Sequence, residues 1–329
     1  MREETVALLP QGSVSKERLA IRLFLVVGLG IGIGPSILLA QAWLPPKGEA
    51  TYSITYQNFF VKEHFNDGVE VDSGHIRSSA AVFELGYGVT DRLAVSVGLP
   101  YVYSKYYGSR PHPSSADDGS YHGTFQNYSF NVRYQALRDP VVVTPFVAAY
   151  IPSHDYQFLA HSAAGRGVEE YLVGINLGRR LDPIMSDGYV HARYSYAFVD
   201  TGTPVDADRS NVNLELGYFL SSSFGVRAFG AYSATHGGLA FAELPRQHPL
   251  WIYHDRILDI DQLDVGGGVT VAMTGSIDLY ASYFGTVWGT NGHKVRNGIT
   301  LGAGWNFSPQ QVFRKLVPSR TAGRDPVIP

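Results

Sequence analysis

Residues 82–105 read VFELGYGVTDRLAVSVGLPYVYSK, and this stretch decides the fold. Apolar residues recur at every second position, first over 83–89 and again over 93–101. Successive side chains of a β-strand point to opposite faces, so each half predicts a strand with one apolar and one polar face. The Thr90-Asp91 step between the halves predicts a tight turn. The stretch is therefore a β-hairpin.

The same period of two repeats along most of the chain, in segments of roughly ten residues. We expect strands at 50–62, 72–88, 92–106, 123–137, 141–151, 167–180, 188–199, 209–220, 224–235, 258–273, 277–288 and 295–307. Aromatic residues gather near the ends of these segments. Two belts of aromatic rings are typical of barrels whose ends sit at the two membrane interfaces.

The connections between the expected strands alternate in character. One set is short and turn-like, and the other is mostly longer and more polar. The second set comprises 63–71, 107–122, 152–166, 200–208, 236–257 and 289–294. A β-sandwich also alternates along its strands, but turns on one rim and loops on the other indicate an outer-membrane barrel. The sequence predicts an all-β fold, a transmembrane antiparallel up-and-down β-barrel of about twelve strands, with its turns periplasmic and its loops outside.

Composition agrees with this class and excludes several others. The net charge of −3 lacks the basic bias of a nucleic-acid-binding protein. The chain has no cysteine, so disulfides, thiolate metal sites and cysteine nucleophiles are excluded. The sequence holds no HExxH, GxSxG or phosphate-loop motif, and we expect no enzyme activity and no cofactor.

The N-terminus has the features of an export signal. Basic residues precede an apolar run at 23–40, and Ala40 and Ala42 form the small-x-small pattern of a signal-peptidase site. We expect cleavage before Trp43; an uncleaved membrane anchor is the alternative. The expected parts are a signal peptide (1–42), an outer-membrane β-barrel (43–307) and a disordered periplasmic tail (308–329). The expected location is the bacterial outer membrane, and the expected partners are its lipid, lipopolysaccharide and the barrel-assembly machinery.

Strand parity assigns nine ionisable residues to the inside of the barrel. They are Glu84, Arg133, Glu170, His191, Arg193, Glu215, Arg227, Asp264 and Asp278. One interpretation is a polar constriction that filters a solute. The other is structural, because inward charges of both signs must neutralise one another in a narrow barrel. The structural interpretation is favoured, and the two are compatible.

The external loops carry two further features. Ten of the eleven histidines fall in or beside them: His64, His75, His112, His122, His154, His161, His236, His248, His254 and His293. Metal binding and pH sensing are alternatives for these imidazoles, but no fixed spacing such as HxxxH is present, so no metal site is assigned. The longest loop is rich in apolar residues, and Phe241, Trp251 and Tyr253 are candidates for a gate folded into the mouth. A cap, or contact with lipopolysaccharide, is the alternative.

Residues 82–105 resemble a known family. An aromatic-glycine strand end, a Thr-Asp-Arg turn and a strand ending in Leu-Pro-Tyr are similar to outer-membrane proteins grouped as components of the meta-pathway of phenol degradation. The resemblance implies a passive or facilitated transporter of small, aromatic compounds. It brings no set of functional residues.

Two functions of different classes therefore stand. The first is a channel or facilitator for a small solute, with aromatic and apolar compounds as the leading candidates. The second is a non-conducting structural or surface-interaction barrel with a plugged lumen. Inward glycines (Gly86, Gly98, Gly174, Gly217, Gly266, Gly268, Gly302 and Gly304) are expected to leave space in the lumen and favour the channel.

Overall fold

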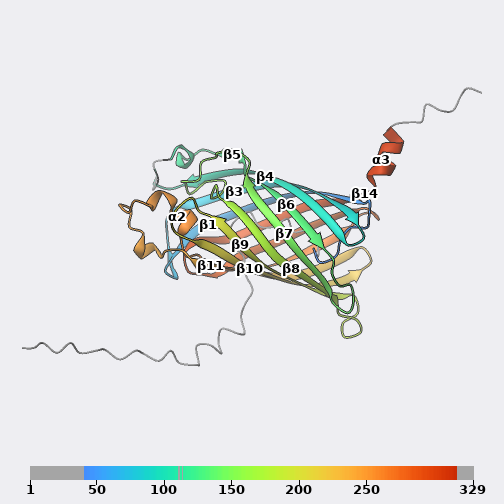
Figure 1. The fold of residues 1–329 in the computed structure, drawn as a ribbon. Coiled ribbons are helices and arrows are strands. Elements are labelled where there is room, and N and C mark those ends of the chain that lie inside the picture. The colour runs from blue at the N-terminus through green and yellow to red at the C-terminus, as the bar shows by residue number, and fades with distance from the viewer. Residues whose placement is uncertain (1–40, 110–111, 113, 317–329) are drawn as a thin grey trace, which may run out of the picture.

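Twelve long antiparallel strands form the wall of one barrel in a computed structural model, which describes residues 41–109, 112 and 114–316 (Figure 1). The wall consists of β1 (Ala50–Asn66), β3 (His75–Thr90), β4 (Leu93–Tyr107), β6 (Asn127–Tyr134), β7 (Val142–Pro152), β8 (Glu169–Arg180), β9 (Gly188–Asp200), β10 (Ala207–Ser221), β11 (Phe224–Gly237), β12 (Gln262–Ala272), β13 (Ile277–Gly289) and β14 (Gly292–Phe307). Two short strands extend it, β2 (Val69–Val71) beside β1 and β5 (His122–Phe125) beside β4. The predicted fold class and strand number are confirmed.

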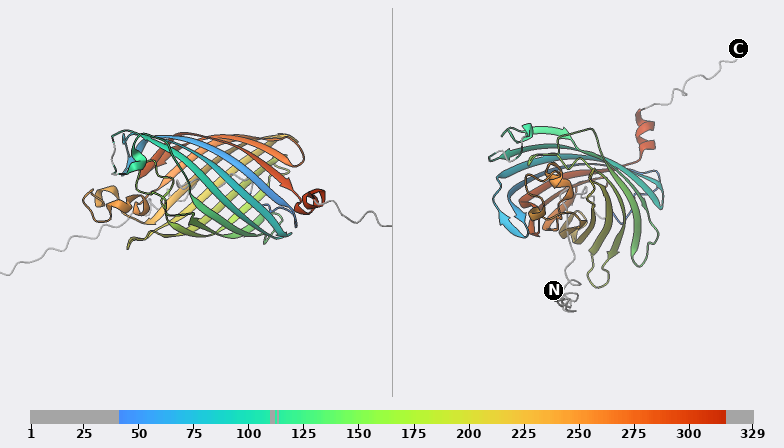
Figure 2. Two further views of the ribbon diagram at one scale, coloured as in Figure 1. Left: turned by 90° about the horizontal axis from the view of Figure 1, so that it is seen from above. Right: turned by 60° about the vertical axis from the view of Figure 1, so that its left-hand side comes forward.

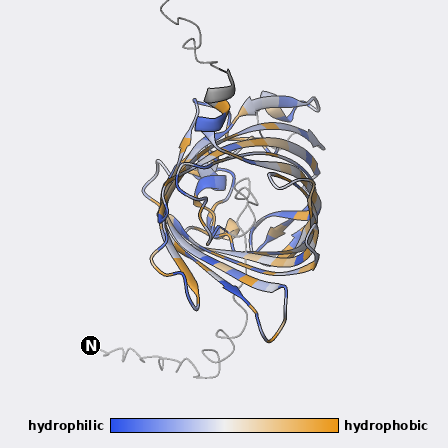
Figure 3. Ribbon diagram, turned by 90° about the vertical axis from the view of Figure 1, so that its right-hand side faces the viewer, coloured by the Kyte–Doolittle hydropathy of each residue, from blue (hydrophilic) through white to orange (hydrophobic). Residues whose placement is uncertain are grey.

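The strands close into a ring, which Figure 3 shows along the barrel axis. The first and last strands pair over their whole length, from Ala50 opposite Phe307 to Phe65 opposite Gly292. On the far side β9 and β10 lie next to each other, and the Tyr196 hydroxyl donates to Asp208 at 2.9 Å. The neighbouring β9 and β10 close the ring, and a closed ring is the form of sheet that a hydrocarbon environment requires.

The expected alternation sorts side chains between the two surfaces of the wall. On β3, Leu85 and Tyr87 are exposed on the outside, whereas Val82 and Glu84 are buried on the inside. The same alternation runs through the neighbouring strands, so the outer surface is apolar and the inner surface is mixed. An apolar outer surface on a closed barrel is the surface that lipid covers.

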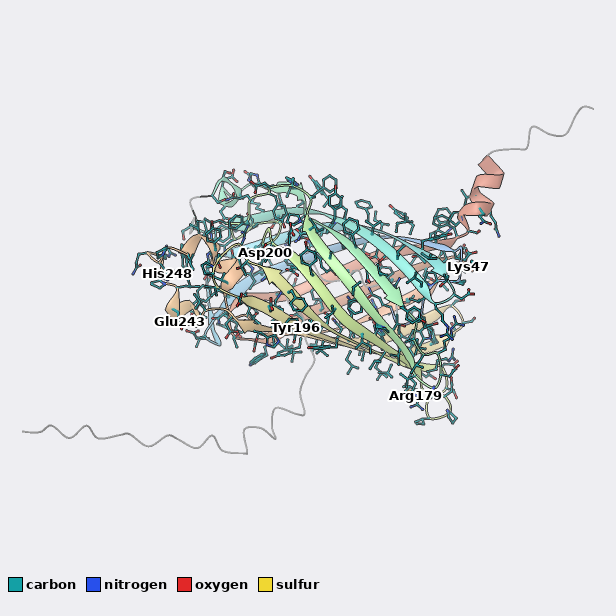
Figure 4. All side chains as sticks on the ribbon, in the orientation of Figure 1. Lys47, Arg179, Tyr196, Asp200, Glu243 and His248 are labelled. Atoms are coloured by element: carbon teal, nitrogen blue, oxygen red, sulfur yellow. The ribbon has the colours of Figure 1, made fainter. Side chains whose placement is uncertain are left out.

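The two ends of the barrel differ. Lys47 and Arg179 lie at the turn end, and Glu243 and His248 at the loop end (Figure 4). The prediction of an external loop over 289–294 is wrong. Only the two residues Thr290 and Asn291 join β13 to β14. Gly292 follows with a φ of +94°, a conformation that glycine adopts without strain.

The loop between β11 and β12 folds into a compact body that we call the lid, residues 238–261. It contains η2 (Phe241–Glu243), η3 (Trp251–Tyr253) and the short helix α2 (His254–Ile257). Leu244, Ile257 and Leu258 form its buried centre. Its apolar residues are therefore covered largely by one another, and the lid lies at the loop end of the barrel (Figure 2). A one-turn helix, η1 (Ser115–Asp117), lies in the β4–β5 connection.

The chain ends of the barrel both lie at its turn end. After β14 comes a helix, α3 (Pro309–Leu316), where a disordered tail was expected. A proline at the first helical position and the Ser308 carbonyl, which accepts the N–H groups of Gln311 and Val312, explain where it begins. Apart from Gln41 and Ala42, the predicted signal peptide lies outside the described residues. No helix in the described part of the chain is long and apolar enough to cross a membrane.

Candidate functional site

The nine ionisable residues predicted inside the barrel all occupy inward positions, at two levels. Glu170 and Asp264 lie toward the loop end, and the other seven lie in the middle and the turn-end half. At the loop end the Glu170 carboxylate accepts hydrogen bonds from Arg166 at 2.7 Å and from Arg209 at 2.5 Å. Asp264 accepts from Thr286 at 2.6 Å and from Gln262 at 3.0 Å. These carboxylates are satisfied by the wall and, through Arg166, by the loop that precedes β8.

A second ion pair lies deeper. Arg227 donates to Glu215 at 2.9 Å, and the Tyr189 hydroxyl donates to the other oxygen of the same carboxylate at 2.7 Å. Asp278 is half-buried near the turn end. The pairs formed by Glu170 and Glu215 fit the structural interpretation of the inward charges, since each neutralises a buried arginine.

Residues 41–49, which we call the N-terminal segment, enter the turn-end half of the lumen. The Ala42 side chain is 0% exposed, and its carbonyl accepts a hydrogen bond from Thr144 at 2.6 Å. Arg133 donates to the carbonyl of Gln41, and Arg193 donates to the Gln41 side chain. Trp43 continues across the lumen and lines a cavity of about 210 Å³. The segment therefore narrows the turn-end half of the barrel. Gln41 and Ala42 belong to the predicted signal peptide, so cleavage before Trp43 would leave Trp43 to Glu49 in this position.

Aromatic rings cover several of the inward glycines. Phe146 lies opposite Gly174, Phe229 opposite Gly266, and Tyr280 opposite Gly302, each in the adjacent strand. A Cβ atom added to any of these glycines would collide with the facing ring. The expectation that these glycines leave open space is therefore wrong: each of the three accommodates a ring that lies flat against the wall. Gly304, in contrast, faces open space.

The loop end encloses a cavity of about 710 Å³, which we call the vestibule. Two of the three expected gate residues, Phe241 and Trp251, line it. Tyr253 does not, and instead stacks on Phe158 with ring centroids 5.9 Å apart. The lining is mixed: apolar and aromatic side chains lie beside histidines, serines and the three arginines Arg166, Arg209 and Arg246. The vestibule can hold a small solute with an apolar part.

One residue that sequence reasoning missed connects the lid to the rest of the loop end. Arg256 donates hydrogen bonds to the carbonyls of Arg166, Gly167 and Thr201 at 2.8, 3.1 and 3.5 Å. Its guanidinium also lies 3.6 Å from the centre of the Phe158 ring. No local sequence pattern predicts that Arg256 makes these contacts, because its three carbonyl partners and Phe158 are all at least 55 residues away in the sequence.

The expected clustering of histidines at the loop end is confirmed, and five of them gather around the vestibule: His64, His112, His161, His254 and His293. The loop between β7 and β8, residues 153–168, brings His161 inward. Burial and the neighbouring His293 and His112 rings lower the pKa of His161 to about 3, so its ring is neutral at neutral pH.

A buried carboxylate fixes this loop. Asp117 accepts the backbone N–H groups of His161 and Ser162 at 2.9 and 3.0 Å, and a hydrogen bond from His112 at 3.3 Å. Burial opposes ionisation, but these hydrogen bonds lower the pKa of Asp117 to about 2. Tyr106 is buried here, and its ring stacks on that of His161 with centroids 4.8 Å apart.

The closed ring of strands, the apolar outer surface and the charged residues on the inner surface together define an outer-membrane β-barrel. No protein-family model matches the sequence, and no curated protein does either. Among solved structures, an outer membrane channel from Pseudomonas putida F1 is similar, with a TM-score of 0.64 and 12% identity over 83% of this chain and all of that one.

Two further structures are more distant. NanC porin has a TM-score of 0.46 and 11% identity, over 77% of this chain and 98% of the porin. The translocator domain of autotransporter NalP from Neisseria meningitidis has a TM-score of 0.47 and 15% identity, over 80% of this chain and 90% of that one. At these identities the similarity concerns the fold.

Proposed function

We propose that the protein is an outer-membrane channel or facilitator for a small solute with an aromatic or apolar part. The observation that carries the proposal is a set of inward arginine donors without a protein partner. Within the described residues, Nε of Arg133, Nε of Arg209, and Nε and Nη2 of Arg227 are buried and lack a hydrogen bond. Buried polar groups normally have a partner, so these donors point to positions in the lumen that a water molecule or a polar group of a solute would have to occupy.

Aromatic rings lie beside two of the inward arginines. The Arg193 guanidinium lies 4.0 Å from the centre of the Phe146 ring, and that of Arg227 lies 5.6 Å from the centre of Phe229. A small aromatic carboxylate would find a ring to stack on and an N–H group to bind in the same place. The family resemblance of residues 82–105 and the channel from Pseudomonas putida F1 support a transport role of this kind.

A plugged, non-conducting barrel is the second candidate, and the N-terminal segment favours it. Gly48 and Glu49 are held to the end of β3, where Gly48 N–H donates to the Gly88 carbonyl at 2.7 Å and Gly88 N–H donates to Glu49 at 2.9 Å. Trp43 to Pro46 extend from this anchor into the lumen. Removing these four residues would widen the turn-end half and keep both hydrogen bonds to Gly88, although the Glu49 N–H would lose its bond to the Pro46 carbonyl at 3.1 Å.

Single-channel recording in planar bilayers tests the proposal. Two forms are compared, one beginning at Trp43 and one beginning at Lys47, each checked for folding by its heat-modifiable mobility on a gel. We expect stepwise conductance in the first form, reduced by benzoate in the millimolar range, and larger steps in the second. Conductance in the truncated form alone would establish the plug. A folded barrel that is silent in both forms would overturn the channel.

A further inference from the structure

We propose that His64, His161 and His293 form a binding site for a divalent transition-metal ion of the zinc type at the loop end of the barrel. Each of the three offers one ring nitrogen, and these nitrogens all lie within 4.8 Å of one another. The site lies in the wall of the vestibule. It does not depend on whether the lumen conducts.

Two of the ligands are placed by the closure of the barrel. His64 on β1 and His293 on β14 lie directly opposite each other in the ladder. Their rings meet edge to face, with centroids 4.4 Å apart. His293 is the second residue of β14, after the tight turn at Thr290 and Asn291. That turn is anchored to the lid, since Asn291 donates to the Asp259 carbonyl at 2.7 Å. These two positions are therefore held by backbone pairing.

The third ligand comes from the loop at 153–168. The His161 ring lies 4.9 Å from the His64 ring and 5.9 Å from the His293 ring, between centroids. Asp117 holds its backbone N–H, and the Tyr106 ring stacks on its other side. The Tyr106 hydroxyl in turn donates to the Ser73 carbonyl at 2.7 Å. The loop histidine is thus fixed by packing and hydrogen bonds before any ligand binds.

His64 is the observation that points to a ligand. Its side chain is 6% exposed, and neither Nδ1 nor Nε2 has a hydrogen-bond partner among residues 41–109, 112 and 114–316. Buried polar side chains normally have a partner, and a neutral imidazole carries a donor and an acceptor that both need one. Edge-to-face packing of the rings satisfies neither nitrogen. A metal ion would bind one of them.

The donor set selects the class of ion. Three neutral imidazoles suit Zn²⁺, Cu²⁺, Ni²⁺ and Co²⁺, whereas Ca²⁺ and Mg²⁺ require oxygen ligands. Nitrogens bound to one tetrahedral zinc ion lie about 3.3 Å apart, so the rings would close by up to about 1.5 Å. The fourth position would face the vestibule and be open to water or to a solute. A bound ion would also tie the 153–168 loop to β1 and β14.

The test is a metal titration of the folded protein in detergent after removal of metals with a chelator. Zn²⁺ binding is measured by calorimetry, and Co²⁺ binding by visible absorption, which reports a tetrahedral nitrogen site. We expect one ion per chain and no comparable binding of Mg²⁺. His161→Ala and His293→Ala should each weaken Zn²⁺ binding at least about 10-fold, because loss of even an outer partner of a ligand has that effect.

His248→Ala is the matched control, because His248 lies on the lid at the loop end (Figure 4) and is not among the residues that line the vestibule. It should leave the affinity unchanged. His161 lies in a loop outside the strand ladder, so His161→Ala should fold and tests the proposed metal site even if His293→Ala does not fold. Absence of saturable one-to-one binding would overturn the proposal. Equal affinity in wild type and His161→Ala, or an equal loss in His248→Ala, would overturn it too.

Discussion

Arg227 donates a hydrogen bond to Glu215 at 2.9 Å inside the barrel, and the arginine side chain is only 1% exposed. Glu215→Gln would remove the charge that compensates this arginine but keep the volume. We expect the free energy of unfolding to fall by about 3 kcal/mol, since an unpaired buried charge is costly. Denaturant titration in detergent micelles measures it. The exposed pair of Arg180 and Asp182 is the control, and Asp182→Asn should cost less than about 1 kcal/mol. Equal effects would contradict the role of burial.

Two glycines on the inner face of β14 offer a matched comparison. Gly302 lies under the Tyr280 ring, whereas nothing lies within 4 Å of a Cβ atom added to Gly304. Gly302→Ala should lower the free energy of unfolding by about 1–3 kcal/mol, because the ring has to move. Gly304→Ala should be neutral or slightly stabilising, because alanine lowers the entropy of the unfolded chain. If the two variants unfold alike, the ring does not rest on Gly302.

Arg256 is expected to hold the lid closed over the vestibule. Arg256→Ala removes its hydrogen bonds to three backbone carbonyls, so the lid should open more often. Chymotrypsin cleavage within residues 238–261 should become about 10-fold faster or more, since about 1.4 kcal/mol of opening free energy is a factor of ten. Arg256→Lys should behave like alanine, because an ammonium cannot reproduce the planar fork. Arg246→Ala, on the same lid, should change little; an unchanged rate in Arg256→Ala would exclude the clamp.

Tyr156 links the 153–168 loop to the barrel. Its buried hydroxyl leads us to expect that the stability of the protein depends on pH in the alkaline range. Its hydroxyl donates to Asn127 at 2.5 Å and accepts the Gly167 N–H, and the side chain is 5% exposed. Burial raises the pKa of Tyr156 to about 12 from an ordinary value of about 10. The folded-state pKa lies above the unfolded one, so the stabilisation is present below about pH 10 and is lost as the pH rises toward 12.

The difference in tyrosinate absorption between wild type and Tyr156→Phe isolates this one ring among 21 tyrosines. We expect the difference to appear near pH 12. A difference that appears near pH 10 would show that the hydroxyl is exposed. Tyr121→Phe, at an exposed ring on the same end of the barrel, is the control for the subtraction.

Sequence reasoning reached the architecture because the relevant signals are local. A period of two identifies a strand from the strand itself, and the Thr90-Asp91 step marks a turn from two residues. Parity predicts that Glu84 and Arg193 point inward, and both side chains are buried in the structure, since closing the sheet preserves the alternation. Sequence reasoning failed where the packing of a side chain on another strand decides the outcome. Gly302 was expected to leave space in the lumen, but the Tyr280 ring on the adjacent strand fills that space.

Residue types and their spacing thus determine that this chain forms a twelve-stranded barrel and that most of its histidines lie at the loop end. The tertiary structure alone decides which of them meet. His64 and His293 are 229 positions apart and become neighbours only when β14 pairs with β1. His161 joins them because Asp117, on another loop, holds its backbone. Local periodicity carries no information about register between distant strands or about loop packing, since both depend on contacts that form only in the closed barrel.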